Sequence, residues 1–204
     1  MKKSNFQKTF NICELVFFTG LLGFISSITL SMAMNALQSL PYLTFFYIFV
    51  SRIHFFVFSL AIISILLFLT LGYHEVYLRL KQDNLVNLWK SIKQTFAIRM
   101  FLKQSEHSET IATVEQMQVT RYNPINKHFN KVAHKAIVDI REDKAILLIQ
   151  IPRTQQATKI LQDMGTLVSE EISNRNPGYN FSPPVRKGKW LLFIGTKSTN
   201  IEKI

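Results

Sequence analysis

The run Gly195-Thr196-Lys197-Ser198 combines a glycine, a lysine and a hydroxyl residue directly after the apolar segment Trp190–Ile194. These residue types bind phosphate in nucleotide-hydrolysing enzymes, where the pattern G-x-x-x-x-G-K-[ST] joins a strand to a helix. Here the lysine does not directly follow the glycine, and the apolar segment supplies no loop glycine. The eight residues after Thr196 are too few for the required helix and sheet. We therefore expect no nucleotide hydrolysis.

A second stretch, His74-Glu75-Val76-Tyr77-Leu78, departs from the zinc motif H-E-x-x-H because leucine replaces the second histidine. One imidazole does not make a zinc site. His74 and Glu75 instead fit a lipid–water boundary, which neighbouring tyrosines favour. No other histidines or carboxylates have the spacing of an acid–base pair or of a nucleophile with its base. The sequence thus predicts no catalytic residue, metal site, cofactor or small-molecule substrate, and a protein that is not an enzyme.

The segment 121–135, RYNPINKHFNKVAHK, interleaves basic side chains with Tyr122 and Phe129. Such a composition fits single-stranded nucleic acid, which proteins bind by phosphate contact and base stacking. The basic run 186–189 joins it if the last strand lies alongside. The alternative is ordinary charge bias near anionic lipid, with Phe129 in the core. The candidate contacts to nucleic acid or another anionic partner are Arg121, Lys127, His128, Lys131, Lys135, Arg186, Lys187 and Lys189.

Two apolar segments precede these candidate residues. No charged side chain occurs from Leu15 to Ser51 or from Ile53 to Tyr73, although the whole chain carries a net charge of +11. A helix needs roughly 20 apolar residues to cross the ~30 Å hydrocarbon core of a bilayer. Leu15–Ala33 and Ile53–Gly72 meet this requirement. Because the backbone must bond to itself inside lipid, both segments are expected to be helices.

The connection between the spans is expected to be short and to end in an interfacial aromatic segment, with Arg52 near the membrane surface. An alternative begins the second helix at Tyr42 and places Arg52 in lipid, at a cost of about 2.5–3.5 kcal/mol. Three lysines precede the first span and six basic residues lie between positions 79 and 103, whereas the connection holds only Arg52. The positive-inside rule therefore predicts a two-span protein of the cell membrane with both termini in the cytoplasm. A cleaved signal peptide ending near Ala33 is the competing interpretation.

The segment Leu78–Gln104 is predicted to be helical. It either lies on anionic lipid or continues from the second span and packs on the domain that follows. The absence of a helix breaker favours the second arrangement. The apolar residues that recur at helical spacing are Leu85, Leu88, Trp89, Ile92, Phe96 and Met100.

The remaining sequence predicts a small α+β domain of the order β-β-α-β, in which one amphipathic helix covers a mostly antiparallel sheet. The clearest expected element is a hairpin, with strands at Lys135–Arg141 and Lys144–Ile151 of high β-branched content around a charged turn at Glu142-Asp143. The other expected elements are a helix from Gln155 to Asn174, a last strand at Trp190–Thr196 and an earlier strand at Val114–Tyr122 that ends at a turn at Asn123-Pro124. The whole chain then divides into a cytoplasmic tail (1–14), a transmembrane hairpin (15–73), a juxtamembrane amphipathic helix (74–104), a linker (105–113) and the α+β domain (114–204).

This layout resembles the region before the motor in FtsK/SpoIIIE-like coupling proteins, the DNA translocases of Gram-positive conjugative elements. The resemblance lies in AIRMFLKQ (97–104), in KAILLIQIPRTQQATKILQDMGTLVSEEI (144–172) and in the closing strand WLLFIGT. In that family an ATPase domain follows the last strand, and this chain stops there, so no catalytic residue carries over. The resemblance implies a non-enzymatic accessory or assembly protein of conjugative DNA transfer, anchored in the membrane and bearing a cytoplasmic docking domain.

The expected partners are the lipid bilayer and a protein, either another chain or a second copy of this one, with nucleic acid as a further candidate. Two rival hypotheses stay open at this point. The protein is a membrane-tethered nucleic-acid-binding module, or it is a membrane exclusion or immunity protein in which the spans and their outer connection matter most.

Overall fold

The computed structural model describes residues 3–111 and 118–198 of the chain. They divide into two compact units, Met1–Leu78 and Arg79–Ile204. The second long helix ends a few residues inside the second unit, so the last turn of that helix is described with that unit.

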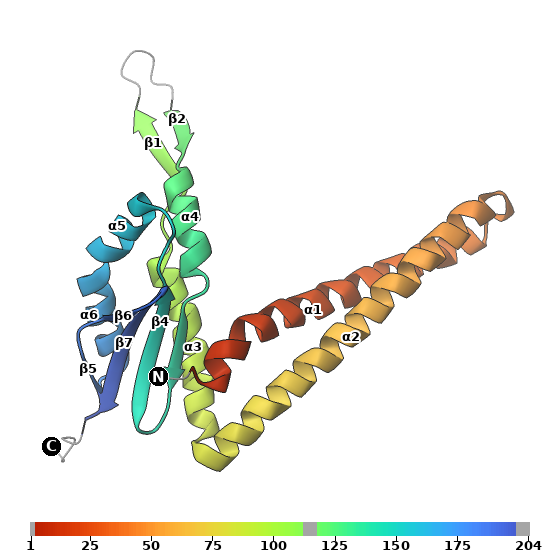
Figure 1. Ribbon diagram of the computed structural model, residues 1–204. Coiled ribbons are helices and arrows are strands. Elements are labelled where there is room, and N and C mark those ends of the chain that lie inside the picture. The colour runs from red at the N-terminus through yellow and green to blue at the C-terminus, as the bar shows by residue number, and fades with distance from the viewer. Residues whose placement is uncertain (1–2, 112–117, 199–204) are drawn as a thin grey trace. The chain divides into compact units, whose positions relative to one another are not determined.

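The first unit is an antiparallel pair of long helices, α1 (Asn5–Gln38) and α2 (Thr44–Gln82), joined through the short 3-10 helix η1 (Pro41–Leu43) (Figure 1). Both helices are long and apolar enough to cross a membrane, and they contain the two predicted spans. Only 11% of the most apolar window of each helix is buried. An apolar surface of this extent is stable only where a nonpolar environment or a partner covers it.

Small residues bring the two helices together. A Cβ added to Gly23 would lie 3.0 Å from the Cβ of Ala61, and one on Gly20 would lie 3.1 Å from a side-chain carbon of Ile65. Near the turn between the helices, the Ser27 hydroxyl lies 3.0 Å from Nε2 of His54. Close backbone approach at small residues, combined with interhelical hydrogen bonds, is how helices associate in lipid.

The predicted start of the second helix is wrong. α2 begins at Thr44 rather than at Ile53, so the aromatic segment is helical and Arg52 lies within the helix. The helix therefore starts close to the alternative start at Tyr42. Pro41 stands at the first position of η1, where its missing N–H costs nothing, and no breaker follows it.

The second unit is an antiparallel sheet with helices, which confirms the α+β class. The strand order is β3-β4-β7-β5, and β6 also pairs with β7. The strands are β3 (Ile137–Ile140), β4 (Lys144–Gln150), β5 (Tyr179–Phe181), β6 (Val185–Lys187) and β7 (Trp190–Lys197). The helices are α3 (Leu85–Leu102), α4 (Pro124–Ala133), α5 (Gln155–Asp163) and α6 (Gly165–Arg175) (Figure 1). A separate two-stranded sheet contains β1 (His107–Ile111) and β2 (Gln118–Tyr122).

The main core lies between one face of the sheet and the helices. Alternate residues of the central strands, such as Leu147 and Phe193, point into it, and the helices contribute residues such as Phe129 and Ile172. Residues of the opposite parity form a second apolar cluster on the other face, made of Ile146, Leu148 and Leu192 with Trp190 and Ile194 against it. Because strand side chains alternate between faces, this pattern fixes the register of the sheet.

The predicted hairpin is confirmed, since β3 and β4 pair antiparallel around the turn at Glu142-Asp143. The single helix expected from Gln155 to Asn174 is instead two helices. Met164 ends α5 in a turn, and Gly165, a poor helix former, begins α6.

Three predictions for the segment 78–124 are wrong. The expected continuous helix breaks at Asp83-Asn84, where the Asn84 side chain caps α3 by accepting from the Val86 N–H. Residues 107–111 of the expected linker form β1. Asn123 and Pro124 are the N-cap and first residue of α4, which the sequence analysis missed. The predicted strand Val114–Tyr122 is β2 from Gln118 onward, and its residues 114–117 lie outside the described residues.

Candidate functional site

The α3 helix closes the free edge of the sheet with polar side chains. The buried hydroxyls of Ser91 and Thr95 accept hydrogen bonds from the N–H groups of Ile140 (2.8 Å) and Val138 (3.0 Å). Nε of Arg99 donates to the carbonyl of Ala136 (2.9 Å). An unpaired strand edge is thereby satisfied by a helix, and the position of α3 relative to β3 is fixed.

The α4 helix is tied to the end of α3 by asparagine side chains. Asn130 accepts from the Gln104 N–H and donates to the Gln104 carbonyl, both at 2.8 Å, and it also donates to the Glu106 carboxylate at 3.0 Å. Asn126 donates to the carbonyl of Ser105 at 2.6 Å. These bonds hold the segment after α3 against α4, so the two helices form opposite walls of one site.

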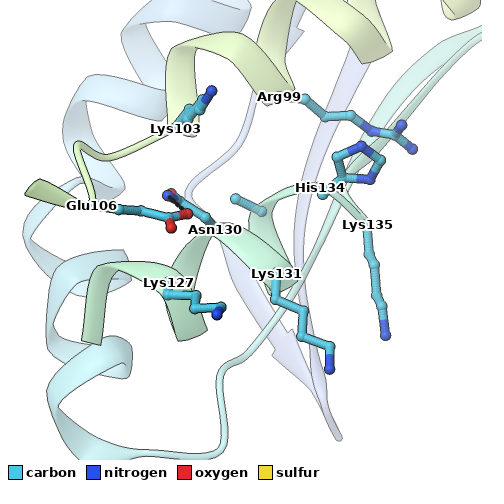
Figure 2. Close-up of a pocket in the computed structure, with 9 residues that line it drawn as sticks. Arg99, Lys103, Glu106, Lys127, Asn130, Lys131, His134 and Lys135 are labelled. Carbon is cyan, nitrogen blue, oxygen red and sulfur yellow. Dashed lines mark hydrogen bonds between the residues drawn. The ribbon is translucent and has the colours of Figure 1, made fainter. Parts of the chain in front are cut away.

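An open pocket of about 570 Å³ lies between these walls. Figure 2 shows Arg99 on α3 and Lys103 directly after this helix on one side of the pocket, with Asn130, Lys127 and Lys131 of α4 on the other side. The pocket is lined by Arg99, Lys103, Glu106, Lys127, Asn130, Lys131, Ala133, His134 and Lys135. Five cationic side chains face one carboxylate, and Asn130 already bonds that carboxylate, so the pocket favours an anion.

An aromatic pair borders the pocket at Lys127. The Lys127 ammonium lies 5.5 Å from the centre of the Tyr122 ring, and that ring meets His107 edge-on at 6.1 Å. Tyr122 and His107 face each other across the β1–β2 register, and the Tyr122 ring is about half exposed. Hydrogen bonding with Tyr122 raises the pKa of Lys127, so this lysine is fully cationic at neutral pH. Cations and an accessible ring therefore lie within a few ångströms of one another.

The predicted contact residues separate into groups. Lys127, Lys131 and Lys135 line the pocket, whereas His128 is exposed on α4 outside the lining. Arg186, Lys187 and Lys189 are exposed on β6 and in the turn to β7, and none of them lines the pocket. Arg121 belongs to β2, but its side chain lies outside the described residues. Phe129 is buried in the core, as the alternative interpretation predicted.

The sequence analysis missed the contribution of α3 and of its following segment. Arg99 and Lys103 are one helical turn apart, a spacing that places them on neighbouring parts of the helix surface. This spacing is visible in the sequence, but it lies in the segment that the sequence predicts to be a juxtamembrane helix outside the domain. Glu106 and Asn130 could not be found from spacing, because the bond between them depends on the fold.

A second charged cluster lies at the end of α2, and it is structural. The Arg79 guanidinium is 1% exposed and bonds the carboxylates of Asp83 and Asp139 and the carbonyl of Ile140. Burial raises the pKa of Asp83, but hydrogen bonds from Asn87 and Arg79 outweigh it, and the net pKa is lowered. Within residues 3–111 and 118–198, Gln94 Oε1 is the one buried side-chain polar atom without a hydrogen-bond partner, so no buried nitrogen of this guanidinium is left over for a ligand.

The phosphate-loop and zinc-motif fragments are also structural. Gly195 lies in β7 under the ring of Phe181, where an added Cβ would come within 2.9 Å of ring carbons. The Glu75 carboxylate is buried and accepts from the Asn5 amide at 2.9 Å. Within residues 3–111 and 118–198, no group of three histidine, cysteine or acidic side chains could hold a metal ion.

Comparison with known proteins adds no assignment. No protein-family model matches the chain, and neither a curated protein nor a solved structure matches it significantly.

Proposed function

We propose that the protein is a non-enzymatic docking protein that is anchored in the cell membrane and holds a nucleic acid through its α+β domain. The observation that carries the proposal is the pocket between α3 and α4, whose lining includes five cationic side chains from these helices and from the one or two residues after each. Basic side chains from one segment alone would be ordinary charge bias. Basic side chains from two separate segments around one concave surface are what a phosphate backbone requires.

The bordering rings favour a single strand over a duplex. Single strands are held by a basic groove that follows the phosphates and by aromatic side chains on which bases stack. Lys127 and Lys131 are about 6 Å apart along α4, and Tyr122 contacts the first of them. A strand whose phosphates follow α4 can therefore place a base against Tyr122. Duplex bases are already stacked and cannot use the ring.

The two apolar helices supply the anchor. With about 20 residues of each in lipid, Arg52 lies at the outer surface, and the basic residues that follow α2 lie on the cytoplasmic side with both termini. Fusions to the C-terminus test this orientation. A green fluorescent protein should fluoresce there, and alkaline phosphatase should stay inactive.

The resemblance to coupling proteins gives the proposal its biological setting. A membrane protein of this layout would act as an accessory of a conjugative DNA-transfer machine, where it would hold the transferred strand or a protein bound to it. A protein partner or a second copy fits the same setting.

The test is fluorescence anisotropy with the full chain in nanodiscs of neutral phosphatidylcholine and a labelled single-stranded oligonucleotide. The triple variant K127A/K131A/K135A should lose most of the affinity, and the slope of log K against log salt should fall by about 2, since each single-strand phosphate contact contributes about 0.7. The matched control R186A/K187A/K189A removes the same charge outside the pocket and should keep both values. Equal loss in the two variants, or no binding by the unmodified chain, would refute the proposal.

Tyr122→Leu separates stacking from charge. Stacking of one base is worth about 1–3 kcal/mol, so single-strand affinity should fall about 5- to 150-fold while duplex affinity is unchanged. An equal change in single-strand and duplex affinity would mean that the pocket binds phosphate without stacking a base.

A further inference from the structure

The outward face of α3 is apolar, although its inward face carries the polar side chains that bond β3. The buried residues of this helix are Ser91, Thr95, Ile98, Arg99 and Leu102. The apolar residues that recur along the sequence face outward instead. Trp89 is 60% exposed and Met100 is 78% exposed, and Leu85 and Phe96 are exposed beside them. The helix thus packs on the domain with the face opposite to the one the sequence analysis expected.

These outward residues form one stripe. At 3.6 residues per turn, Leu85, Trp89, Phe96 and Met100 fall within an arc of about 60° around the helix axis. We refer to these four residues as the α3 stripe. Isolated exposed apolar residues are normal, but an aligned row of four that includes a tryptophan indicates an interaction surface.

The charged side chains that α3 itself carries are all positive. Lys93 lies beside it, with its ammonium 6.0 Å from the Trp89 ring centre, and Lys90 flanks it. The whole of α3 contains no acidic residue. A stripe of this composition complements a surface that is apolar below and anionic above, which describes the boundary of an anionic bilayer. A protein partner would have to supply both properties on one patch.

The chain connection keeps lipid within reach. α3 begins three residues after the end of α2, and only ten residues separate Gly72, the last residue of the apolar segment, from that end. These residues span about 25 Å at most, from 1.5 Å per helical residue and about 3.5 Å per extended residue. The stripe therefore meets a bilayer at a local concentration that no free partner reaches.

From these observations we propose that the α3 stripe lies in the interface of an anionic membrane, with Trp89, Phe96 and Met100 inserted at the head-group boundary and Lys90 and Lys93 on lipid phosphates. Of the proposed function, the inference uses only the membrane anchor. Lys127, Lys131 and Lys135, which line the pocket from outside α3, take no part in it. The domain is then held against the bilayer by α3 as well as by the spans.

The fluorescence of Trp89 can show whether this residue lies in lipid. Since Trp89 and Trp190 are the two tryptophans of the chain, the variant W190F emits from Trp89 alone. It is reconstituted into nanodiscs of phosphatidylcholine and phosphatidylglycerol, with bromine atoms placed either near the head group or near the chain terminus. We expect strong quenching by the shallow bromines and weak quenching by the deep ones, because interfacial helices lie about 5–10 Å into the head-group boundary. The matched variant W89F, which emits from Trp190, should be quenched by neither.

Lipid charge supplies the second readout. Each lysine near an anionic surface favours the docked state about fivefold, so K90Q/K93Q should lower the docked-to-free ratio about thirtyfold and reduce the quenching. The quenching should also be weaker when the unmodified stripe meets nanodiscs of pure phosphatidylcholine, because these carry no anionic lipid. The pocket variant K127A/K131A/K135A should leave quenching unchanged, so failure of nucleic-acid binding and failure of this inference are distinguishable.

A spin label gives an independent measurement if W190F does not fold. Cys13 is the only cysteine, so C13S/M100C carries one label on the stripe and C13S/K159C carries one on the exposed face of α5. The label at position 100 should collide with oxygen more than with a water-soluble nickel chelate, and the label at position 159 should do the reverse. Absence of quenching at Trp89, or nickel access at position 100 equal to that at position 159, would overturn the proposal. Either result would assign the stripe to a protein partner or to a second copy.

Discussion

The substitution Thr95→Val tests whether side chains of α3 truly replace a neighbouring strand. Threonine and valine have nearly the same shape, so the change removes one hydroxyl and keeps the packing. In the folded protein the Val138 N–H then loses its acceptor at 3.0 Å, in a place where both residues are fully buried. The hydroxyl proton, which bonds the Ser91 carbonyl at 2.7 Å, is lost as well, but that carbonyl keeps its helical partner.

The magnitude follows from the unsatisfied donor. Leaving a buried N–H without an acceptor costs about 1–3 kcal/mol, which corresponds to a 5- to 150-fold increase in the opening of the β3 edge. Hydrogen–deuterium exchange of the full chain in detergent measures this directly in peptides that contain residues 136–140. Because the edge opens locally, exchange should accelerate there far more than in β7, which lies inside the sheet.

Ser173→Ala is the matched control. The Ser173 hydroxyl donates to the carbonyl of Ser169 at 2.7 Å, the same helical bond that Thr95 makes, but no strand N–H among the described residues bonds to it. Its removal should leave exchange at 136–140 unchanged. If Thr95→Val also leaves that exchange unchanged, or if Ser173→Ala alters it equally, then the hydroxyls of α3 do not satisfy the strand edge and the reasoning fails.

The remaining predictions concern stability. Arg79→Met should destabilise the full chain by about 3–5 kcal/mol in thermal or denaturant unfolding, because it removes the buried guanidinium that pairs with two buried carboxylates, and adding Asp139→Leu should recover part of the loss. The lowered pKa of Asp83 stabilises the fold fully above its ordinary value of 3.8 and ceases to do so as the pH falls through the lowered value. The difference in melting temperature between the unmodified chain and Asp83→Asn should therefore be constant at neutral pH and shrink in strong acid. Gly195→Ala should cost about 1–3 kcal/mol, because its methyl group would meet the Phe181 ring.

Each of these has a contrary outcome. A double variant that stays as unstable as Arg79→Met would show that the guanidinium is needed for more than charge balance. A melting difference for Asp83→Asn that grows in acid would reverse the sign of the linkage. For Gly195, the control is Gly165→Ala in α6, where nothing lies within 4 Å of the added methyl group and alanine is the better helix former. Equal melting temperatures for the two glycine variants would contradict the packing argument.

The sequence predicted correctly those elements whose formation depends on neighbouring residues alone. The β-branched content of the two strands and the charged turn at Glu142-Asp143 predicted the hairpin of β3 and β4, and the length of the uncharged segments predicted two long helices. The α4 helix was missed because Asn123-Pro124 fits both a turn and a helix start, and only the bonds from the Asn123 side chain to two following N–H groups distinguish them.

The orientation of α3 could not be predicted from its own sequence. Apolar periodicity marks a face that avoids water, and it does not say whether a domain or another environment covers that face. The polar face of α3 is buried because an edge strand offers it N–H and carbonyl groups, a property of β3 rather than of α3. Only part of the pocket could be predicted, for the same reason. Its lysines on α4 lie in one segment, whereas Arg99 and Glu106 reach it only through the fold.

The bonding of α3 to β3 also limits how long β3 can be. Residues four apart on a helix advance about 6.0 Å, whereas residues two apart on a strand advance about 6.8 Å, so the two repeats lose register by about 0.8 Å at each step. From Ala136 to Ile140 the accumulated offset is about 1.6 Å, which side chains absorb at bond lengths of 2.8–3.0 Å. A further step would bring the offset to about 2.4 Å, more than a hydrogen bond tolerates.

The next strand donor, the Glu142 N–H, is accepted at 3.1 Å by Asp83, which lies across the break between α2 and α3. The helix break thus resets the mismatch between the two repeats. A helix can stand in for a strand over only a few residues, and β3 has just four.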